Sequence, residues 1–143
     1  DLVKAGKRVA LVSTSNDSIS MIFLKRNIDY YIYDTVDEVN AKAMELIEKD
    51  CYDVMVVYNG NYDGIMHKFG TESEEAIAAL KANLAFYCRL VGAIKQHWAQ
   101  HNTLYGFMPD HGCHEIDGGC GAHGVGMEED MNIVHLYGCN ARK

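Results

Sequence analysis

Short apolar runs alternate along this chain with stretches in which apolar side chains recur every three or four positions. The apolar runs predict strands over residues 8–12, 30–33, 53–58, 103–108 and 133–137. The helical spacing predicts a helix over 18–26, a second that begins with a capping box at Thr35 and Glu38, and a third over 77–98. The third is the clearest, because its apolar positions form one continuous stripe, which is typical of core packing. The stripe consists of Ile77, Leu80, Leu84, Tyr87, Val91, Ile94 and Trp98.

Strands that alternate with helices of this length predict an α/β fold, a layered sandwich with a largely parallel central sheet and helices on both faces. The 53–58 strand is apolar on both faces and is therefore expected at the centre of the sheet. Since the chain has one proline and no linker or repeat, residues 1–143 are expected to form a single α/β domain. Ligands of such sheets bind beyond the carboxyl ends of the strands, and polar, glycine-rich segments follow two strands at 59–71 and 109–130.

Charge and composition exclude several classes of partner. The 143 residues are 48% hydrophobic and 23% charged, enough for a buried core, and the net charge is −7. Nucleic acid and anionic membranes require clustered Lys and Arg, so neither is expected as a partner. No apolar run approaches the ~20 residues that cross a bilayer. The odd number of cysteines, five, indicates reduced thiols and a cytoplasmic location.

The two polar segments contain the residues best suited to chemistry. The first has Asp63 and His67, four positions apart; the second has Asp110 and His111 directly after a strand, and His123 further on. Carboxylates beside imidazoles suit borderline divalent cations such as zinc, whereas magnesium and calcium prefer sites rich in carboxylates and water. These residues therefore predict a metal site near the carboxyl ends of two strands.

A strand followed by D-x-x-x-H-x-x-G, a long helix, a strand that ends in D-H-G and a later H-G resembles the alkaline phosphatase superfamily. That group includes the type I phosphodiesterase/nucleotide pyrophosphatases and the cofactor-independent phosphoglycerate mutases. The likeness extends over residues 53–137, more than half of the chain. It implies an alkaline phosphatase-like fold and a metal-dependent hydrolase or transferase of the phosphodiesterase or phosphatase type, whose substrate is a small-molecule phosphate ester.

The resemblance also implies a site for two divalent metal ions, zinc rather than manganese. Asp63, His67 and His123 match the ligands of the first ion, and Asp110 and His111 match ligands of the second. Two ions about 3.5–4 Å apart hold the attacking and leaving oxygens of an in-line displacement. Metal charge, rather than Lys or Arg, would then bind the phosphate, in keeping with the acidic composition.

The nucleophile is expected outside this chain. In the family a further Asp ligand and a Ser or Thr nucleophile come from a region well before D-x-x-x-H, and the 62 residues that precede Asp63 are too few for it. Thr14, Ser15 and Asp17 follow a strand, but the family places the Asp before the Ser or Thr. The chain is therefore expected to be the carboxy-terminal part of a longer catalytic domain and to be inactive by itself.

Other residues of the second polar segment have both a functional and a structural interpretation. His114 and Glu115 either line a substrate pocket or belong to a solvated loop, and the acidic run 128–130 predicts a helix start or a solvated turn. No basic neighbour or helix start indicates a reactive thiol at Cys113 or Cys120.

Two alternatives remain for the metal chemistry. A structural zinc site is one, although its spacing differs from the usual paired Cys-x-x-Cys and His-x-x-x-His, and adjacent Cys113 and His114 would have difficulty reaching one tetrahedral ion together. Its ligands would be Cys113, His114, Cys120 and His123. The alternative for the whole chain is a non-catalytic metal-binding or interaction module.

Overall fold

The computed structural model describes residues 2–15 and 17–142 as a mixed α/β chain that divides into two compact units. The first unit comprises Asp1–Gly60 and Gly92–Trp98, and the second comprises Asn61–Val91 and Ala99–Lys143. The α/β class expected from the sequence is confirmed, with small sheets in each unit. That residues 1–143 form a single domain stays a prediction.

A three-stranded parallel sheet forms the centre of the first unit. Its strands are β1 (Val9–Thr14), β2 (Asp29–Tyr33) and β3 (Val54–Val57), in the order β2-β1-β3. β1 is the middle strand, and its residues 10–13 are buried because neighbours cover both of its edges. The sequence predicts a central place for the 53–58 strand, but in this sheet β3 is an edge strand whose residues are half-buried.

Two helices of the first unit follow the predicted starts. Helix α1 (Ser18–Ile22) ends earlier than the expected 18–26, since Lys25 has a φ of 66°, a left-handed conformation that a helix does not continue. Helix α2 (Val36–Lys49) begins with the predicted capping box: Thr35 Oγ1 accepts the Glu38 N–H at 3.3 Å, and the Glu38 carboxylate accepts the Thr35 N–H at 3.1 Å. The buried face of α2 packs into the core of the unit.

Replacing Thr35 with Ala is expected to lower the free energy of unfolding by about 1 kcal/mol, because one backbone N–H of the first turn loses its acceptor. The shift in the midpoint of urea unfolding measures this. Glu48→Ala, at an exposed position near the other end of α2, serves as the control and is expected to change the free energy by less than about 0.5 kcal/mol. Equal effects of both changes would contradict the importance of the cap.

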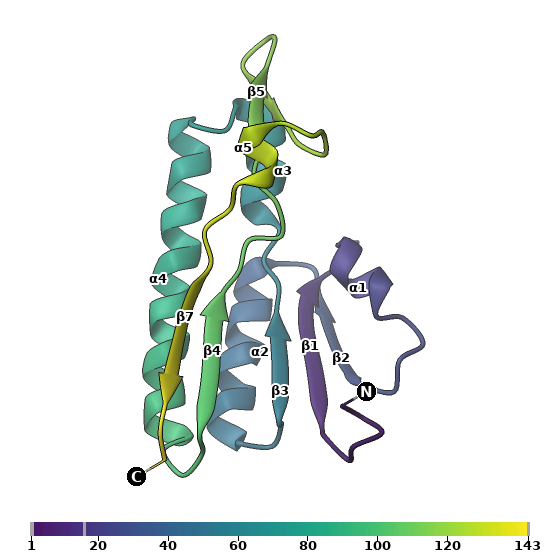
Figure 1. Ribbon diagram of the computed structural model, residues 1–143, viewed down its shortest axis with the longest axis vertical. Coiled ribbons are helices and arrows are strands. Elements are labelled where there is room, and N and C mark those ends of the chain that lie inside the picture. Colours follow the sequence, from purple (N-terminus) through teal and green to yellow (C-terminus); the bar gives the residue numbers. More distant parts are fainter. Residues whose placement is uncertain (1, 16, 143) are drawn as a thin grey trace. The chain divides into compact units, whose positions relative to one another are not determined.

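In the second unit, the β5–β6 hairpin, α3 and α5 gather at one end of the β4–β7 ladder (Figure 1). The helices are α3 (Asn61–Phe69), α5 (Glu128–Met131) and the part of α4 (Glu74–His97) that precedes Gly92. The strand pairs are both antiparallel: β4 (Thr103–Phe107) with β7 (Leu136–Asn140), and β5 (His114–Ile116) with β6 (Cys120–Ala122). The predicted 77–98 helix is confirmed in α4, which begins three residues earlier.

Parts of the second unit differ from what the sequence predicts. The two polar, glycine-rich segments contain regular elements that the pattern does not predict: α3 within 59–71, whose acidic first turn and basic last turn suit the helix dipole, and the β5–β6 hairpin within 109–130. The start of α5 at the acidic run 128–130 agrees with the prediction of a helix start. The last strand begins at Leu136 rather than 133 and is antiparallel to β4, because the hairpin and α5 return the chain to the end of β4 that it had left. The strand pairs of this unit are therefore antiparallel, not part of a parallel sheet.

Helix α4 corrects a further expectation. It is 24 residues long, with a mean hydropathy of 1.4 over its most apolar window, so by length and composition it is able to cross a membrane. The expectation that no segment reaches this length is wrong. A core helix passes the same test, and α4 buries Ala76, Ala79, Phe86, Ala93 and Ile94.

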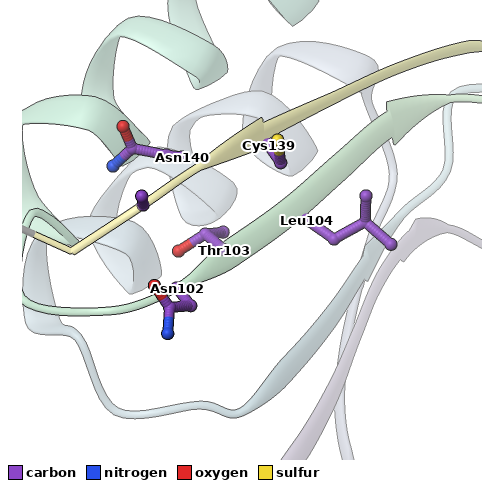
Figure 2. Close-up of a pocket in the computed structure, with 6 residues that line it drawn as sticks. Asn102, Thr103, Leu104, Cys139 and Asn140 are labelled. Carbon is purple, nitrogen blue, oxygen red and sulfur yellow. The ribbon is translucent and has the colours of Figure 1, made fainter.

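An open hollow lies where β4 begins and β7 ends (Figure 2). Its lining residues are Asn102, Thr103, Leu104, Cys139, Asn140 and Ala141. The lining is mostly apolar, and no ionisable side chain other than the Cys139 thiol contributes to it. It lies at the end of β4 opposite to the polar segment that follows Phe107, so it is separate from the predicted metal ligands.

Candidate metal centre

Helix α3 holds the first two predicted ligands. Asp63 and His67 are four residues apart and therefore share one helix face, with His67 Nε2 3.5 Å from Asp63 Oδ1. The other ring nitrogen, His67 Nδ1, lies 2.9 Å from the Gly121 carbonyl oxygen. A carbonyl oxygen only accepts hydrogen bonds, so Nδ1 carries a proton and Nε2 is the ring nitrogen that faces Asp63.

Strand β6 approaches α3 closely at a glycine. A Cβ atom on Gly121 would lie 2.6 Å from Met66 Sδ and 2.8 Å from the Met66 carbonyl oxygen. Met66 is fully buried and its carbonyl is backbone, so neither atom is free to move away. The absence of a side chain at Gly121 thus lets β6 lie against the helix, which places His123, two residues later, beside Asp63.

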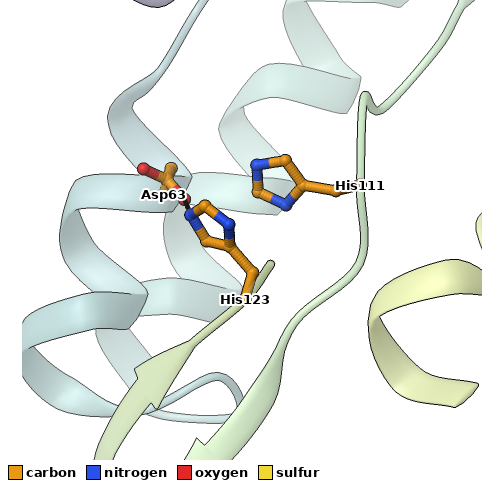
Figure 3. Close-up of side chains that lie close together, drawn as sticks. All are labelled: Asp63, His111 and His123. Carbon is orange, nitrogen blue, oxygen red and sulfur yellow. Dashed lines mark ion pairs between the residues drawn. The ribbon is translucent and has the colours of Figure 1, made fainter. Parts of the chain in front are cut away.

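Two further histidines complete the cluster (Figure 3). His123 Nε2 lies 3.1 Å from Asp63 Oδ1, and the His111 ring stacks on the His123 ring with centroids 3.8 Å apart. One ligand atom each from Asp63, His111 and His123 lies within 4.8 Å of the others. Three separate segments of the chain therefore bring possible ligand atoms within 4.8 Å of one another.

The loop that carries His111 is fixed by the residue after it. A Cβ atom on Gly112 would lie 1.9 Å from the Glu129 carbonyl oxygen, so only glycine allows this loop to lie against α5. The Gly112 N–H donates to the Asp130 carbonyl at 2.8 Å. His111 Nδ1 lies 2.8 Å from the Gly112 carbonyl oxygen, and the Nε2 atom is therefore the one available to a ligand.

The cluster fits a divalent metal ion. Asp63 Oδ1 is a buried atom with no hydrogen bond of normal geometry, and its nearest polar neighbours are His123 Nε2 and His67 Nε2, at 3.1 and 3.5 Å. A cation among these atoms would compensate the desolvation of the carboxylate. One carboxylate with imidazole nitrogens is a ligand set typical of zinc. Backbone carbonyls that accept from the remote ring nitrogen, as at His67 and His111, also orient zinc-binding histidines in other proteins.

The structure groups the predicted ligands differently from the two expected sets. His111, assigned to the second ion, stands with Asp63 and His123 of the first, and His67 adjoins them. Asp110 is 57% exposed at its side chain, with Oδ1 3.9 Å from His111 Nε2, and lies at the edge of the cluster. The division of ligands between two ions stays a prediction.

His114 and Glu115 both make hydrogen bonds to other segments of the chain, although Glu115 is an exposed residue. His114 Nδ1 lies 2.7 Å from Asp130 Oδ1, and its side chain is only 13% exposed. Glu115 Oε1 accepts hydrogen bonds from the Thr71 N–H and from Thr71 Oγ1, both at 2.6 Å, and these bonds hold the pKa of the Glu115 carboxyl below its usual range. Glu115 thus fastens the segment that enters α4, a structural contact that the sequence pattern does not reveal. Their place in a substrate pocket stays a prediction.

Asp130 is a residue whose importance the sequence does not show. Its acidic run does start helix α5, as predicted, but the Asp130 side chain is not solvated: the residue is 3% exposed. The hydrogen bond from His114, together with the Val125 N–H at 3.0 Å, holds the pKa of the Asp130 carboxyl below its usual range. Its partners are backbone groups and a histidine 16 residues away, a combination without a sequence signature.

The alternative zinc site of cysteines and histidines does not form among the described residues. The Cys113 thiol lies 3.4 Å from the Tyr62 hydroxyl, the Cys120 thiol lies 3.8 Å from the Lys68 carbonyl, and His114 is paired with Asp130. All five cysteines are free thiols.

Comparisons with protein-family models, with curated proteins and with solved structures give no match to this chain.

Proposed function

We propose that this chain supplies metal ligands to a two-metal hydrolase or transferase of phosphate esters. The observation that supports the proposal is the convergence of four of the five predicted ligands, Asp63, His67, His111 and His123, from three separate segments. The burial of Asp63 Oδ1 beside two imidazole nitrogens adds to it, because a cation would compensate the desolvation of the carboxylate.

When bound, the ions would supply positive charge to the phosphate oxygens and lower the pKa of an attacking hydroxyl or water. The part of this chain is to hold the ligands in place: α3 orients Asp63 and His67, and the loops after β4 and β6 deliver His111 and His123. Asp110, exposed beside His111, would join a second ion from the solvent side in this proposal.

The remaining parts of the proposal follow from the motif order. The substrate is a small-molecule phosphate ester, with zinc as the favoured metal over manganese, and the nucleophile belongs to polypeptide outside these 143 residues. The complete catalytic domain would have the layered alkaline phosphatase-like sheet, to which this chain contributes its carboxy-terminal part.

The test uses the chain itself and two probes, zinc and inorganic phosphate. Isothermal titration is expected to show zinc binding, and inorganic phosphate is expected to bind the zinc-loaded chain but not the metal-free chain, because metal charge holds the anion. His97→Ala, in the last turn of α4, is the control and should bind zinc like the natural chain.

Each result has a distinct meaning. Absence of zinc binding would refute the proposal. Zinc binding without zinc-dependent phosphate binding would favour the non-catalytic metal-binding module instead. Hydrolysis of bis(p-nitrophenyl) phosphate by the zinc-loaded chain is expected to be negligible, and sustained turnover would show that the nucleophile lies within the chain.

A further inference from the structure

The buried carboxylate of Asp130 lies between the two loops that carry His111 and His123. One oxygen, Oδ1, accepts from His114 Nδ1 at 2.7 Å, and the other, Oδ2, accepts from the Val125 N–H at 3.0 Å. Asp130 therefore binds Val125, two residues after His123.

The backbone of the same residue binds the other loop. The Asp130 carbonyl accepts the N–H of Gly112, the residue directly after His111, at 2.8 Å. The tight approach of Gly112 to Glu129, one residue before Asp130, keeps this loop in contact with α5. Helix α5 thus makes hydrogen bonds to both loops, close to the histidine that each loop carries.

We propose that Asp130 is a positioning residue of the metal centre, whose side chain and carbonyl hold His111 and His123 at the separation that a metal ion requires. This inference rests on the proposed function, since it assumes that the cluster binds metal. Asp130 itself takes no ligand position, because both of its oxygens are engaged with the loops and with His114.

The chemistry of the contact explains why a carboxylate occupies this position. Backbone N–H groups are donors only, and Asp130, which is 3% exposed, supplies the acceptor that holds the Val125 N–H against the protein. An apolar side chain at 130 would leave the Val125 N–H without its partner, and the loop would move to reach water. An asparagine would keep an oxygen for that N–H and could donate from its amide to the other tautomer of His114.

The test compares zinc affinities of three variants with that of the natural chain. Asp130→Leu, similar in size but without an acceptor, is expected to weaken zinc binding roughly 10–100-fold, the range typical of partners that orient metal ligands. Asp130→Asn, which keeps the acceptor for Val125, is expected to remain within about threefold of the natural chain. Glu129→Leu, the same change at the exposed neighbouring position, is the matched control and is expected to leave affinity unchanged.

Folding is separated from positioning by measuring the folded fraction of each metal-free variant from urea unfolding, and by comparing dissociation constants per folded molecule. The absorption spectrum of bound Co²⁺ adds a readout of ligand number and geometry, which Asp130→Leu should alter and Glu129→Leu should not.

An unchanged affinity and Co²⁺ spectrum in Asp130→Leu would overturn the positioning role while the metal centre stands. So would an equal loss in Asp130→Leu and Asp130→Asn, since the acceptor would then not be the cause. A natural chain that binds no zinc would overturn both this inference and the proposed function.

Discussion

Replacing Asp63 with Ala is expected to abolish zinc binding, with a loss of affinity of more than about 100-fold, beyond what partners outside the ligand shell produce. Asp63 Oδ1 is the atom on which His123 Nε2 and His67 Nε2 converge, at 3.1 and 3.5 Å. Competition with a chelator of known zinc affinity measures the loss. Without the carboxylate the site keeps imidazoles alone and lacks the charge that attracts the ion.

The same substitution separates metal binding from stability. In the metal-free protein, Asp63 Oδ1 is a buried atom whose nearest polar neighbours are His123 Nε2 and His67 Nε2, so the change removes only partly exposed ion pairs and is expected to alter the free energy of unfolding by less than about 1 kcal/mol. Zinc is expected to raise the melting temperature of the natural chain but not that of Asp63→Ala. Asp117→Ala, at the exposed turn of the hairpin, is the control that should retain the zinc response. Retention of that response by Asp63→Ala would remove Asp63 from the centre.

Replacing Gly112 with Ala is expected to have the largest effect on stability, a loss of about 3 kcal/mol, at the upper end of the range for overpacking. The new Cβ would lie 1.9 Å from the Glu129 carbonyl oxygen and 3.0 Å from its carbonyl carbon, and both are backbone atoms of α5. The loop must therefore shift, and it would lose the bond from the Gly112 N–H to Asp130. Zinc affinity is expected to fall together with the midpoint of urea unfolding.

Gly64→Ala provides the matched control for this change. Gly64 lies in α3, and a Cβ atom there meets nothing within 4 Å. Alanine is a better helix former than glycine by about 1 kcal/mol, so Gly64→Ala is expected to raise stability. A stable Gly112→Ala protein with natural zinc affinity would show that the loop does not need its close contact with α5.

The elements that the sequence predicts correctly are those determined by residues close together in the chain, such as a helix cap or an apolar stripe. The Thr35–Glu38 capping box fixes the start of α2, and the apolar stripe after Ile77 identifies α4. Helix α3 was missed because Asn61 and Gly64 are typical of loops, while its stabilising features are charges at its ends and the buried Met66. The direction of β7 depends on how the hairpin and α5 turn the chain, which no periodicity encodes.

The sequence likewise predicts one part of the candidate site and does not predict another. The resemblance selected Asp63, His67 and His123 as one ligand set, and the structure brings them within reach of one another. It did not anticipate that His111 would join them, because the direction of that side chain depends on the contact of Gly112 with α5. The sequence predicts a helix start or a solvated turn at Asp130 and does not reveal its buried contacts, because they join it to a distant histidine and to a backbone N–H group, which every residue except proline possesses.

The location of Asp63 and His67 on a helix limits how this chain can change in length over evolution. An insertion of one residue between them would turn His67 about 100° around the helix axis, away from Asp63. The interval between His111 and His123 contains a hairpin in which His114 is paired with Ala122, and its turn at 117–119 faces solvent. Residues added in that turn would leave both ends of the hairpin in place. Related chains should therefore keep the first spacing invariant and tolerate insertions and deletions in the second.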